Sequence, residues 1–289
     1  MAATKQSIGV IGLGLMGTAI TERLLAHGYP VSVWNRSRDK AKPLIERGAV
    51  WSTNPILDCE RVIISLYSSD VVADVIEQLK TGLRTSQILI DTTTGKPDDC
   101  IAMGKRLAAA GVHYLDAPIS GSSEQTRRGE AMVMAGGDRL TFDACADIWP
   151  VLGTTVYYTG ESGTASRMKL VSNLVLGLNR VALAEGLSYA QAIGVDPDLA
   201  LEVLRDSAAY SRVMDIKGKK MLTSDYSVQA KLSQHLKDVR IILSSATDVG
   251  LELPMSQAHR ALLVRAESEG CGELDNSSII RVYRGREVE

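Results

Sequence analysis

Lys169 and Asn173 are polar residues in a segment whose apolar residues otherwise recur with helical spacing. Because they are four positions apart, we expect them on one face of a helix, one turn from each other. An ammonium group and an amide placed in this way can contact one substrate oxygen, and a lysine in a cleft can donate or accept a proton. The alternative is a lysine at the exposed end of a helix, with its charge in water.

A glycine-rich segment near the N-terminus, Gly12-Leu13-Gly14-Leu15-Met16-Gly17, fits the pattern G-x-G-x-x-G. It follows an apolar run typical of a strand and precedes a helical pattern, which is the context that a dinucleotide site requires. There the glycines allow a tight turn, close approach of a pyrophosphate and close helix–strand packing, and the helix N-terminus offers amides to the anion. We expect the whole segment to bind the cofactor; the alternative is that the glycines serve only the turn.

The second expected strand is followed directly by Asn35-Arg36-Ser37, where a site for NAD would carry Asp or Glu to bind the ribose hydroxyls. A carboxylate would repel a 2′-phosphate, whereas a guanidinium pairs with it and short polar side chains add hydrogen bonds. These residues therefore favour NADP over NAD as the cofactor. The alternative is that Arg36 is a solvated surface charge.

Three further segments combine hydroxyls, carboxylates or a lysine with turn residues, where expected strands or helices begin or end. They are residues 91–95, 116–122 and 163–173. In an open parallel sheet the ligand binds outside the carboxyl ends of the strands, so we expect these segments to converge on one crevice.

The elements that would position these residues change in kind at Gly163. Before it, short runs rich in Val and Ile alternate with helical patterns, which is typical of a parallel sheet; after it, long helical patterns follow one another. The expected strands are residues 7–13, 31–34, 61–66, 87–91, 113–115, 131–135 and 155–158, and the expected long helices are residues 164–193, 196–209, 228–248 and 254–269. We predict an α/β fold with two domains: a Rossmann-type, doubly wound parallel sheet in residues 1–163, which binds the dinucleotide, and an all-α domain in residues 164–289.

The composition indicates a chain with a substantial core and little net charge. Of 289 residues 45% are hydrophobic, and 32 basic residues face 34 acidic ones, for a net charge of −2. This balance favours a small molecule over a nucleic acid as the partner. The start of the chain lacks the features of a signal peptide, and the most apolar long segment contains Asn173, Arg180 and Glu185, which a membrane span tolerates poorly. We expect a cytoplasmic protein with no membrane partner.

The cysteines and histidines are scattered along the chain. Cys59, Cys100, Cys145 and Cys271 lack the paired spacing of a zinc site, and His27, His113, His235 and His259 show no metal-ligand spacing. We expect free thiols, ordinary packing or surface histidines, and no metal.

Taken together, these segments resemble the β-hydroxyacid dehydrogenase family over nearly the whole chain. The resemblance is carried by the glycine segment, by Asp116-Ala117-Pro118-Ile119-Ser120-Gly121, by Lys169 with Asn173, and by Lys237-Asp238. The family includes enzymes of 3-hydroxyisobutyrate, 6-phosphogluconate and tartronate semialdehyde. The resemblance also implies that the helical domain, residues 164–289, serves the substrate and oligomerisation, and that the chain forms a homodimer or homotetramer through it.

The resemblance implies roles for individual positions. Lys169 matches the family's catalytic lysine, Ser120 its substrate-binding serine and Asn173 its substrate-orienting asparagine. Thr94 matches a threonine beside the nicotinamide, and Lys237 with Asp238 matches a late helix pair that closes over cofactor and active site. We assign the cofactor to the glycine segment with Asn35, Arg36, Ser37, Leu66, Thr94 and Lys237, and the substrate to Ser120, Gly121, Ser122, Lys169, Asn173 and Asp238.

The expected reaction is hydride transfer between NADP(H) and a small hydroxy acid or its aldehyde or keto form, of the 3-hydroxyisobutyrate or semialdehyde type. Lys169 is the expected acid or base, and an ordinary lysine pKa of about 10.4 favours proton donation in reduction. The substrate is expected to be anionic. Possible extra anchors for it are Arg127, Arg128, Arg212 and Lys231, unless these are exposed charges on polar turns.

Two other functions use the same architecture. The chain departs from the family's pattern in residues 122–128, which are polar and charged where glycines and small apolar residues are usual, so the identity of the substrate stays open. An imine reductase usually carries Asp or Tyr at the position of Lys169. A non-catalytic scaffold or sensor that binds a dinucleotide needs Gly14 and Arg36 but not Lys169. The presence of Lys169 favours the dehydrogenase.

Overall fold

The structure is a computed structural model that describes residues 5–284. The chain forms two compact units, Met1–Lys169 and Leu170–Glu289. The division falls within a single long helix, α9 (Thr164–Ala192), whose first turns belong to the first unit. The sequence analysis placed the boundary at the start of this helix, where the sequence pattern changes.

The first unit is built on one twisted sheet. Its strands are β1 (Ile8–Ile11), β2 (Val31–Trp34), β3 (Val50–Trp51), β4 (Arg61–Ile64), β5 (Ile88–Asp91), β6 (His113–Asp116), β7 (Ile119–Ser120), β8 (Met132–Gly137) and β9 (Thr155–Gly160). They are ordered β3-β2-β1-β4-β5-β6-β8-β7, and β9 pairs with β8. The strands from β3 to β6 are parallel. Strands β2 and β3 are added on one side of β1 and strands β4 to β6 on the other, so the strand order reverses between β1 and β4, which is the switch point of a doubly wound sheet.

Neighbouring residues of the central strands enter two separate cores, one on each face of the sheet. Val10 and Ile63 pack into one apolar cluster, whereas Ile11, Val62 and Ile64 pack into the other. This follows from the alternation of side chains along a strand. Because helices cover both faces, the strands consist of continuous apolar runs, as the sequence analysis expected for a buried parallel sheet.

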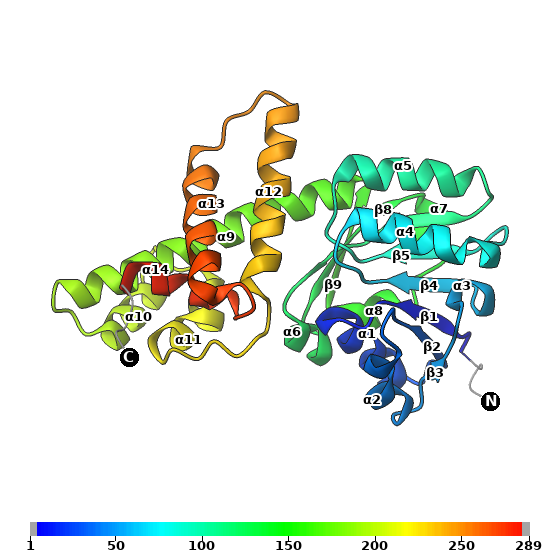
Figure 1. Cartoon of the computed structure of the whole chain (residues 1–289), viewed down its shortest axis with the longest axis horizontal. Coiled ribbons are helices and arrows are strands. Elements are labelled where there is room, and N and C mark those ends of the chain that lie inside the picture. The colour runs from blue at the N-terminus through cyan, green and yellow to red at the C-terminus, as the bar shows by residue number, and fades with distance from the viewer. Residues whose placement is uncertain (1–4, 285–289) are drawn as a thin grey trace. The chain divides into compact units, whose positions relative to one another are not determined.

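Helices on opposite faces supply the other half of each core (Figure 1). The cluster of Val10 and Ile63 includes residues of α1 (Leu15–Ala26), α2 (Lys42–Ile45) and α8 (Trp149–Leu152). The opposite cluster includes residues of α3 (Pro55–Asp58), α4 (Ser69–Leu79) and α5 (Pro97–Ala108). The remaining helical segments of this unit are η1 (Arg38–Ala41), η2 (Lys80–Gly82), α6 (Ser123–Arg128) and α7 (Arg139–Asp143).

Three details of this unit differ from the sequence expectations. The sheet is parallel only in part, because β8 runs antiparallel to β6 and β7. The two-residue strands β3 and β7 were not expected, since two residues are too few to show a periodic pattern. The polar segment after Ser122, for which the sequence analysis gave no helix, forms the short helix α6.

The second unit is helical. After α9 come α10 (Pro197–Asp206), η3 (Met214–Gly218), α11 (Lys219–Leu222), α12 (Leu232–Asp248), α13 (Pro254–Ala266), η4 (Glu267–Cys271), η5 (Asn276–Ile280) and α14 (Arg281–Arg284). Its core gathers Leu183 and Leu187 of α9, Leu236 of α12 and Leu263 of α13. The four long helices predicted from the sequence are all present, with α12 starting later than expected and the short helices unforeseen.

Within the described residues, α9 is long and apolar enough to cross a membrane by length and composition. Its buried side chains nevertheless include the polar and charged groups of Lys169, Asn173 and Arg180. Such groups are unfavourable in lipid, which indicates that this face of α9 packs against protein.

Candidate functional site

The glycine turn joins β1 to α1, and each glycine has a different reason to lack a side chain. Gly12 has φ +95°, and an added Cβ would collide with the carbonyl oxygen of Ser65. An added Cβ at Gly17 would overlap the carbonyl oxygen of Gly12. A Cβ at Gly14 would meet no atom within 4 Å, and Gly14 caps α1 without a side-chain hydrogen bond. The amides at the start of α1 are therefore left open to a ligand, as binding of a pyrophosphate requires.

Asn35 holds this turn from the end of β2. Its Oδ1 accepts a hydrogen bond from the Leu13 amide at 2.9 Å, and its Nδ2 donates to the carbonyl oxygen of Ser37 at 3.0 Å. Arg36 and Ser37 are exposed, and the next basic residue, Arg38, stacks over the Trp51 ring at 5.4 Å. Asn35 thus shapes the loop, while the guanidinium of Arg36 remains on its surface where a phosphate could reach it.

A buried network joins the loops that follow β4 and β5. The Leu66 amide donates to Oγ1 of Thr93 at 3.1 Å, and the Thr93 amide donates to Oδ1 of Asp91 at 2.9 Å. The Tyr114 hydroxyl donates to the other Asp91 oxygen at 2.8 Å. Burial raises the pKa of Asp91 to about 6, although these hydrogen bonds oppose the shift. The network supports the loops that contain Leu66 and Thr94. The sequence analysis did not identify Thr93 and Tyr114 as members of it.

Ser120 closes β7, and the residues after it turn into α6. Gly121 has φ +152°, and an added Cβ there would lie 3.1 Å from the Cβ of Ala131, the residue before β8. The Ser122 hydroxyl accepts from the Gln125 amide at 3.2 Å, and the Ser122 amide donates to Oε1 of Gln125 at 2.9 Å. These reciprocal bonds form a capping box, so the Ser122 side chain is already engaged in starting α6.

Three of the four basic side chains that suggested extra anion anchors have acidic partners in the chain, and the fourth, Arg212, is exposed. Arg127 pairs with Glu22 at 2.5 Å, Arg128 with Glu130 at 2.9 Å and Lys231 with Glu273 at 2.5 Å. Their positive charges are therefore balanced locally. This favours the alternative in which they are surface ion pairs, which contribute little to stability or recognition.

Lys169 belongs to the first unit and is buried, with 7% of its surface exposed. This contradicts the alternative of a lysine whose charge stands in water at an exposed helix end. A charged side chain is seldom buried unless it is paired or functional.

In the helical unit, Asn173 and Asp238 form a buried pair. Nδ2 of Asn173 donates to Oδ2 of Asp238 at 2.9 Å, and the ammonium group of Lys237 lies 3.1 Å from Oδ1 of Asp238. The carboxylate thereby fixes the Asn173 amide, whose Oδ1 is the acceptor turned away from this bond. Asn173 and the pair Lys237-Asp238, which the sequence analysis selected separately, lie together in this unit.

Two histidines pack beside this pair, against Gly177 of α9. The rings of His235 and His259 are 5.2 Å apart, and an added Cβ at Gly177 would lie 2.5 Å from Nε2 of His235. Burial, together with the charge of Arg180, lowers the pKa of His259 to about 4, so this imidazole is neutral at neutral pH. Sequence reasoning had no signal for this pair, because the two rings come from different helices.

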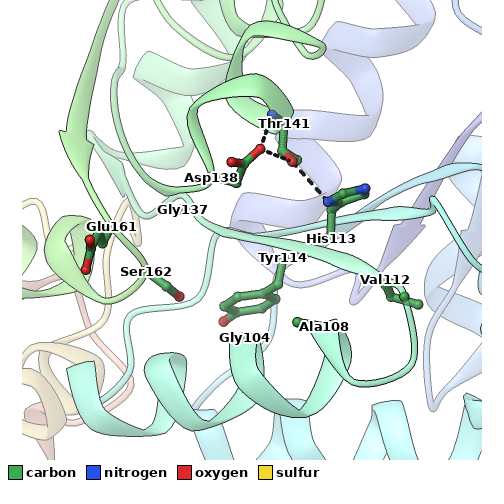
Figure 2. A pocket seen from close by; sticks show the side chains of 11 residues that line it. Gly104, Ala108, Val112, His113, Tyr114, Gly137, Asp138, Thr141, Glu161 and Ser162 are labelled. Atoms are coloured by element: carbon green, nitrogen blue, oxygen red, sulfur yellow. Dashed lines mark hydrogen bonds between the residues drawn. The ribbon is translucent and has the colours of Figure 1, made fainter.

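A hollow of about 330 Å³ opens elsewhere on the first unit, beside α5 and α7 (Figure 2). Tyr114 and Ser162 line it, and at its rim Oγ1 of Thr141 lies 3.1 Å from Nδ1 of His113. None of the residues assigned to cofactor or substrate lines this hollow. Residues 5–284 contain no cluster of three or more His, Cys, Asp or Glu side chains that could hold a metal ion.

Both units match known family models. Residues 7–160 match the NAD binding domain of 6-phosphogluconate dehydrogenase, and residues 163–283 match the NAD-binding domain of NADP-dependent 3-hydroxyisobutyrate dehydrogenase. The chain belongs to the β-hydroxyacid dehydrogenase family. It is accordingly an NAD(P)-dependent oxidoreductase of the class that acts on CH–OH groups, and the family prediction from the sequence is confirmed.

Individual relatives cover nearly the whole chain. Glyoxylate/succinic semialdehyde reductase 1 of Arabidopsis thaliana is 30% identical, over 96% of this chain and 98% of the relative. The cytokine-like nuclear factor N-PAC of Homo sapiens is 28% identical over 97% of this chain, which spans only 52% of that protein. The solved structure of Psf3 in complex with NADP+ and 2-OPP is 27% identical, with a TM-score of 0.87 over 95% of this chain and 99% of that one.

The geometry of the glycine turn predicts that Gly17→Ala lowers stability, whereas Gly14→Ala lowers cofactor affinity. Gly17→Ala forces a Cβ into the Gly12 carbonyl, so we expect the melting temperature to fall by roughly 5–10 °C. Gly14→Ala adds a methyl group in open space, so stability should change little, while the methyl obstructs the pyrophosphate and raises the NADPH Kd by about 10-fold or more. Calorimetry and fluorescence titration measure the two effects. Unchanged NADPH affinity in Gly14→Ala would contradict the assignment of this turn.

Proposed function

We propose that the chain is an NADP(H)-dependent reductase of a small aldehyde or keto acid, of the 3-hydroxyisobutyrate or semialdehyde type, which also catalyses the reverse oxidation. The observation that supports it most directly is Lys169, a buried lysine near the start of α9 in a chain that belongs to this family. The open amides at Gly14 and the exposed Arg36 fit the pyrophosphate and the 2′-phosphate of the cofactor.

In this mechanism the bound nicotinamide supplies the hydride, and the protein supplies the proton and the geometry. Lys169 donates a proton to the substrate oxygen as the carbonyl carbon is reduced, and it takes the proton back in oxidation. Ser120 and the amides beside it hold the acidic group of the substrate. Asn173, one turn beyond Lys169, orients the substrate with the part of its amide that Asp238 does not engage.

Replacing Lys169 tests this function. We expect Lys169→Ala to lower kcat about 10²- to 10⁴-fold, because the positioned proton donor is lost, with the NADPH Kd unchanged. Lys105→Ala, which removes an exposed lysine of α5, is the matched control and should leave both quantities unchanged. The assay follows NADPH oxidation with small acidic aldehydes, uncharged aldehydes and cyclic imines. Undiminished turnover in Lys169→Ala would overturn the proposal, and turnover of imines alone would indicate an imine reductase.

We also propose NADP as the preferred cofactor, with Arg36 as the residue that selects it. Arg36→Ala should raise the NADPH Kd about 10- to 100-fold, as expected for loss of a charge-assisted contact with the 2′-phosphate, and should leave the NADH Kd nearly unchanged. Arg106→Ala removes another exposed arginine of the same unit and is the control. Equal losses for NADPH and NADH in Arg36→Ala would show that this side chain does not read the phosphate.

The outward face of α9 supports a homo-oligomer as the working form. Met168, Val171 and Val175 are 49%, 58% and 51% exposed, which makes an apolar stripe that a second copy of the chain could cover. Light scattering should give the mass of a dimer or tetramer, and Val171→Glu with Val175→Glu should shift it to that of one chain. Val249→Glu, at a separate exposed apolar position, is the control. A wild-type mass of one chain at micromolar concentration would refute this.

A further inference from the structure

Asp116 is a buried carboxylate to which the reaction so far assigns no role. It ends β6, and 1% of its surface is exposed. In the sheet it lies opposite Asp91 of β5 on one side and Gly136 of β8 on the other. Thr93 and Tyr114 donate hydrogen bonds to Asp91 and not to Asp116, whose hydrogen-bond donors lie elsewhere in the chain.

The donors to Asp116 are backbone amides at the beginning of α9. Oδ1 of Asp116 accepts from the Gly163 amide at 2.8 Å, and Oδ2 accepts from the Ser166 amide at 2.9 Å. Amides in the first turn of a helix have no partner within the helix, and the positive end of the helix dipole favours a negative charge there. Most helices receive such a cap from an adjacent residue. Here the cap comes from 47 and 50 positions earlier in the chain, so it ties a strand of the sheet to the helix.

Other contacts hold the same turn in place. A Cβ at Gly136 would lie 2.8 Å from Oδ1 of Asp116 and 2.8 Å from Oγ1 of Thr164, so only glycine leaves room for this approach. The hydroxyl groups of Thr159 and Thr164 are 2.8 Å apart, and Sγ of Cys100 lies 3.2 Å from Oγ of Ser166. The first turn of α9 is therefore fixed to the ends of β6, β8 and β9 and to α5.

Lys169 follows Ser166 by three positions on this helix, so the place of its ammonium group depends on where that turn is held. Asp116 and Ser120 also stand in one short segment of the chain, so a single segment carries the cap of the lysine helix and the serine assigned to the substrate. We propose that Asp116 is a positioning residue of the reaction, which sets the distance between Lys169 and the substrate oxygen through the start of α9. This inference rests on the proposed role of Lys169.

The substitution Asp116→Asn isolates the cap. An amide presents only one acceptor oxygen, and its NH₂ group would face a backbone N–H, so one of the two bonds is lost. Because a displacement of about 1 Å at a reacting group can cost about 10²-fold, we expect kcat to fall about 10- to 100-fold with the NADPH Kd unchanged. Asp138→Asn is the matched control, since Asp138 caps α7 of the same unit by accepting from the Thr141 amide at 2.8 Å. It should leave kcat unchanged.

A double-mutant cycle with Lys169→Ala separates positioning from general damage. If Asp116 acts through Lys169, Asp116→Asn should cost less than about 3-fold once the lysine is gone. The same loss in both backgrounds, or no loss in the wild-type background, would overturn the inference. A Lys169→Ala variant with full activity would instead refute the proposed function. Should Asp116→Asn fail to fold by circular dichroism, Gly136→Ala takes its place in the cycle, because its methyl group presses on the same carboxylate.

Discussion

The unpaired amides at helix N-termini are the groups around which the nucleotide-binding unit is organised. Each helix that follows the carboxyl edge of the sheet brings amides that must find an acceptor. At α1 the cap is Gly14, which offers no side chain, so the amides stay available for an anionic ligand. At α6 the cap is the local pair of Ser122 and Gln125, and at α9 it is the distant carboxylate of Asp116. One chemical requirement is thus met by a ligand site, a local cap and a long-range clamp.

The buried sheet makes these differences possible. The strands are apolar over most of their length, and the polar residues Asp91, Asp116 and Ser120 stand at their carboxyl ends, where the loops to the helices begin. Both carboxylates, Asp91 and Asp116, are almost fully buried, and each accepts hydrogen bonds from neighbouring groups of the protein. Such groups are costly to bury without partners, which explains why the loops around them are held by several contacts each.

The charges of the protein separate into two kinds. Several surface arginines and lysines, such as Arg127 and Lys231, form ion pairs with a carboxylate of the same chain, so their charge is balanced locally. Arg36 is exposed at the loop after β2, and Lys169 is buried on α9. Because the chain belongs to the β-hydroxyacid dehydrogenase family, we propose these two residues for contact with the cofactor phosphate and for proton transfer.

Local sequence was sufficient for the features that depend on neighbours in the chain. The glycine turn, the buried strands, the four long helices and the selection of Arg36, Lys169 and Asn173 all follow from spacing, from residue type or from resemblance to the family. Periodicity encodes which face of an element is buried, and a motif encodes its own backbone. The two-residue strands and the capped helix α6 escaped this reasoning, because they are too short for a period or depend on a turn.

Only the tertiary structure decided which distant groups meet. The contacts of Asp116 with the start of α9, of Tyr114 with Asp91 and of Arg127 with Glu22 join residues 23 to 105 positions apart. The same holds for the two histidines that pack on Gly177. Such pairs are set by how whole elements pack, and a polar residue in a sequence carries no mark of the partner that packing will bring to it.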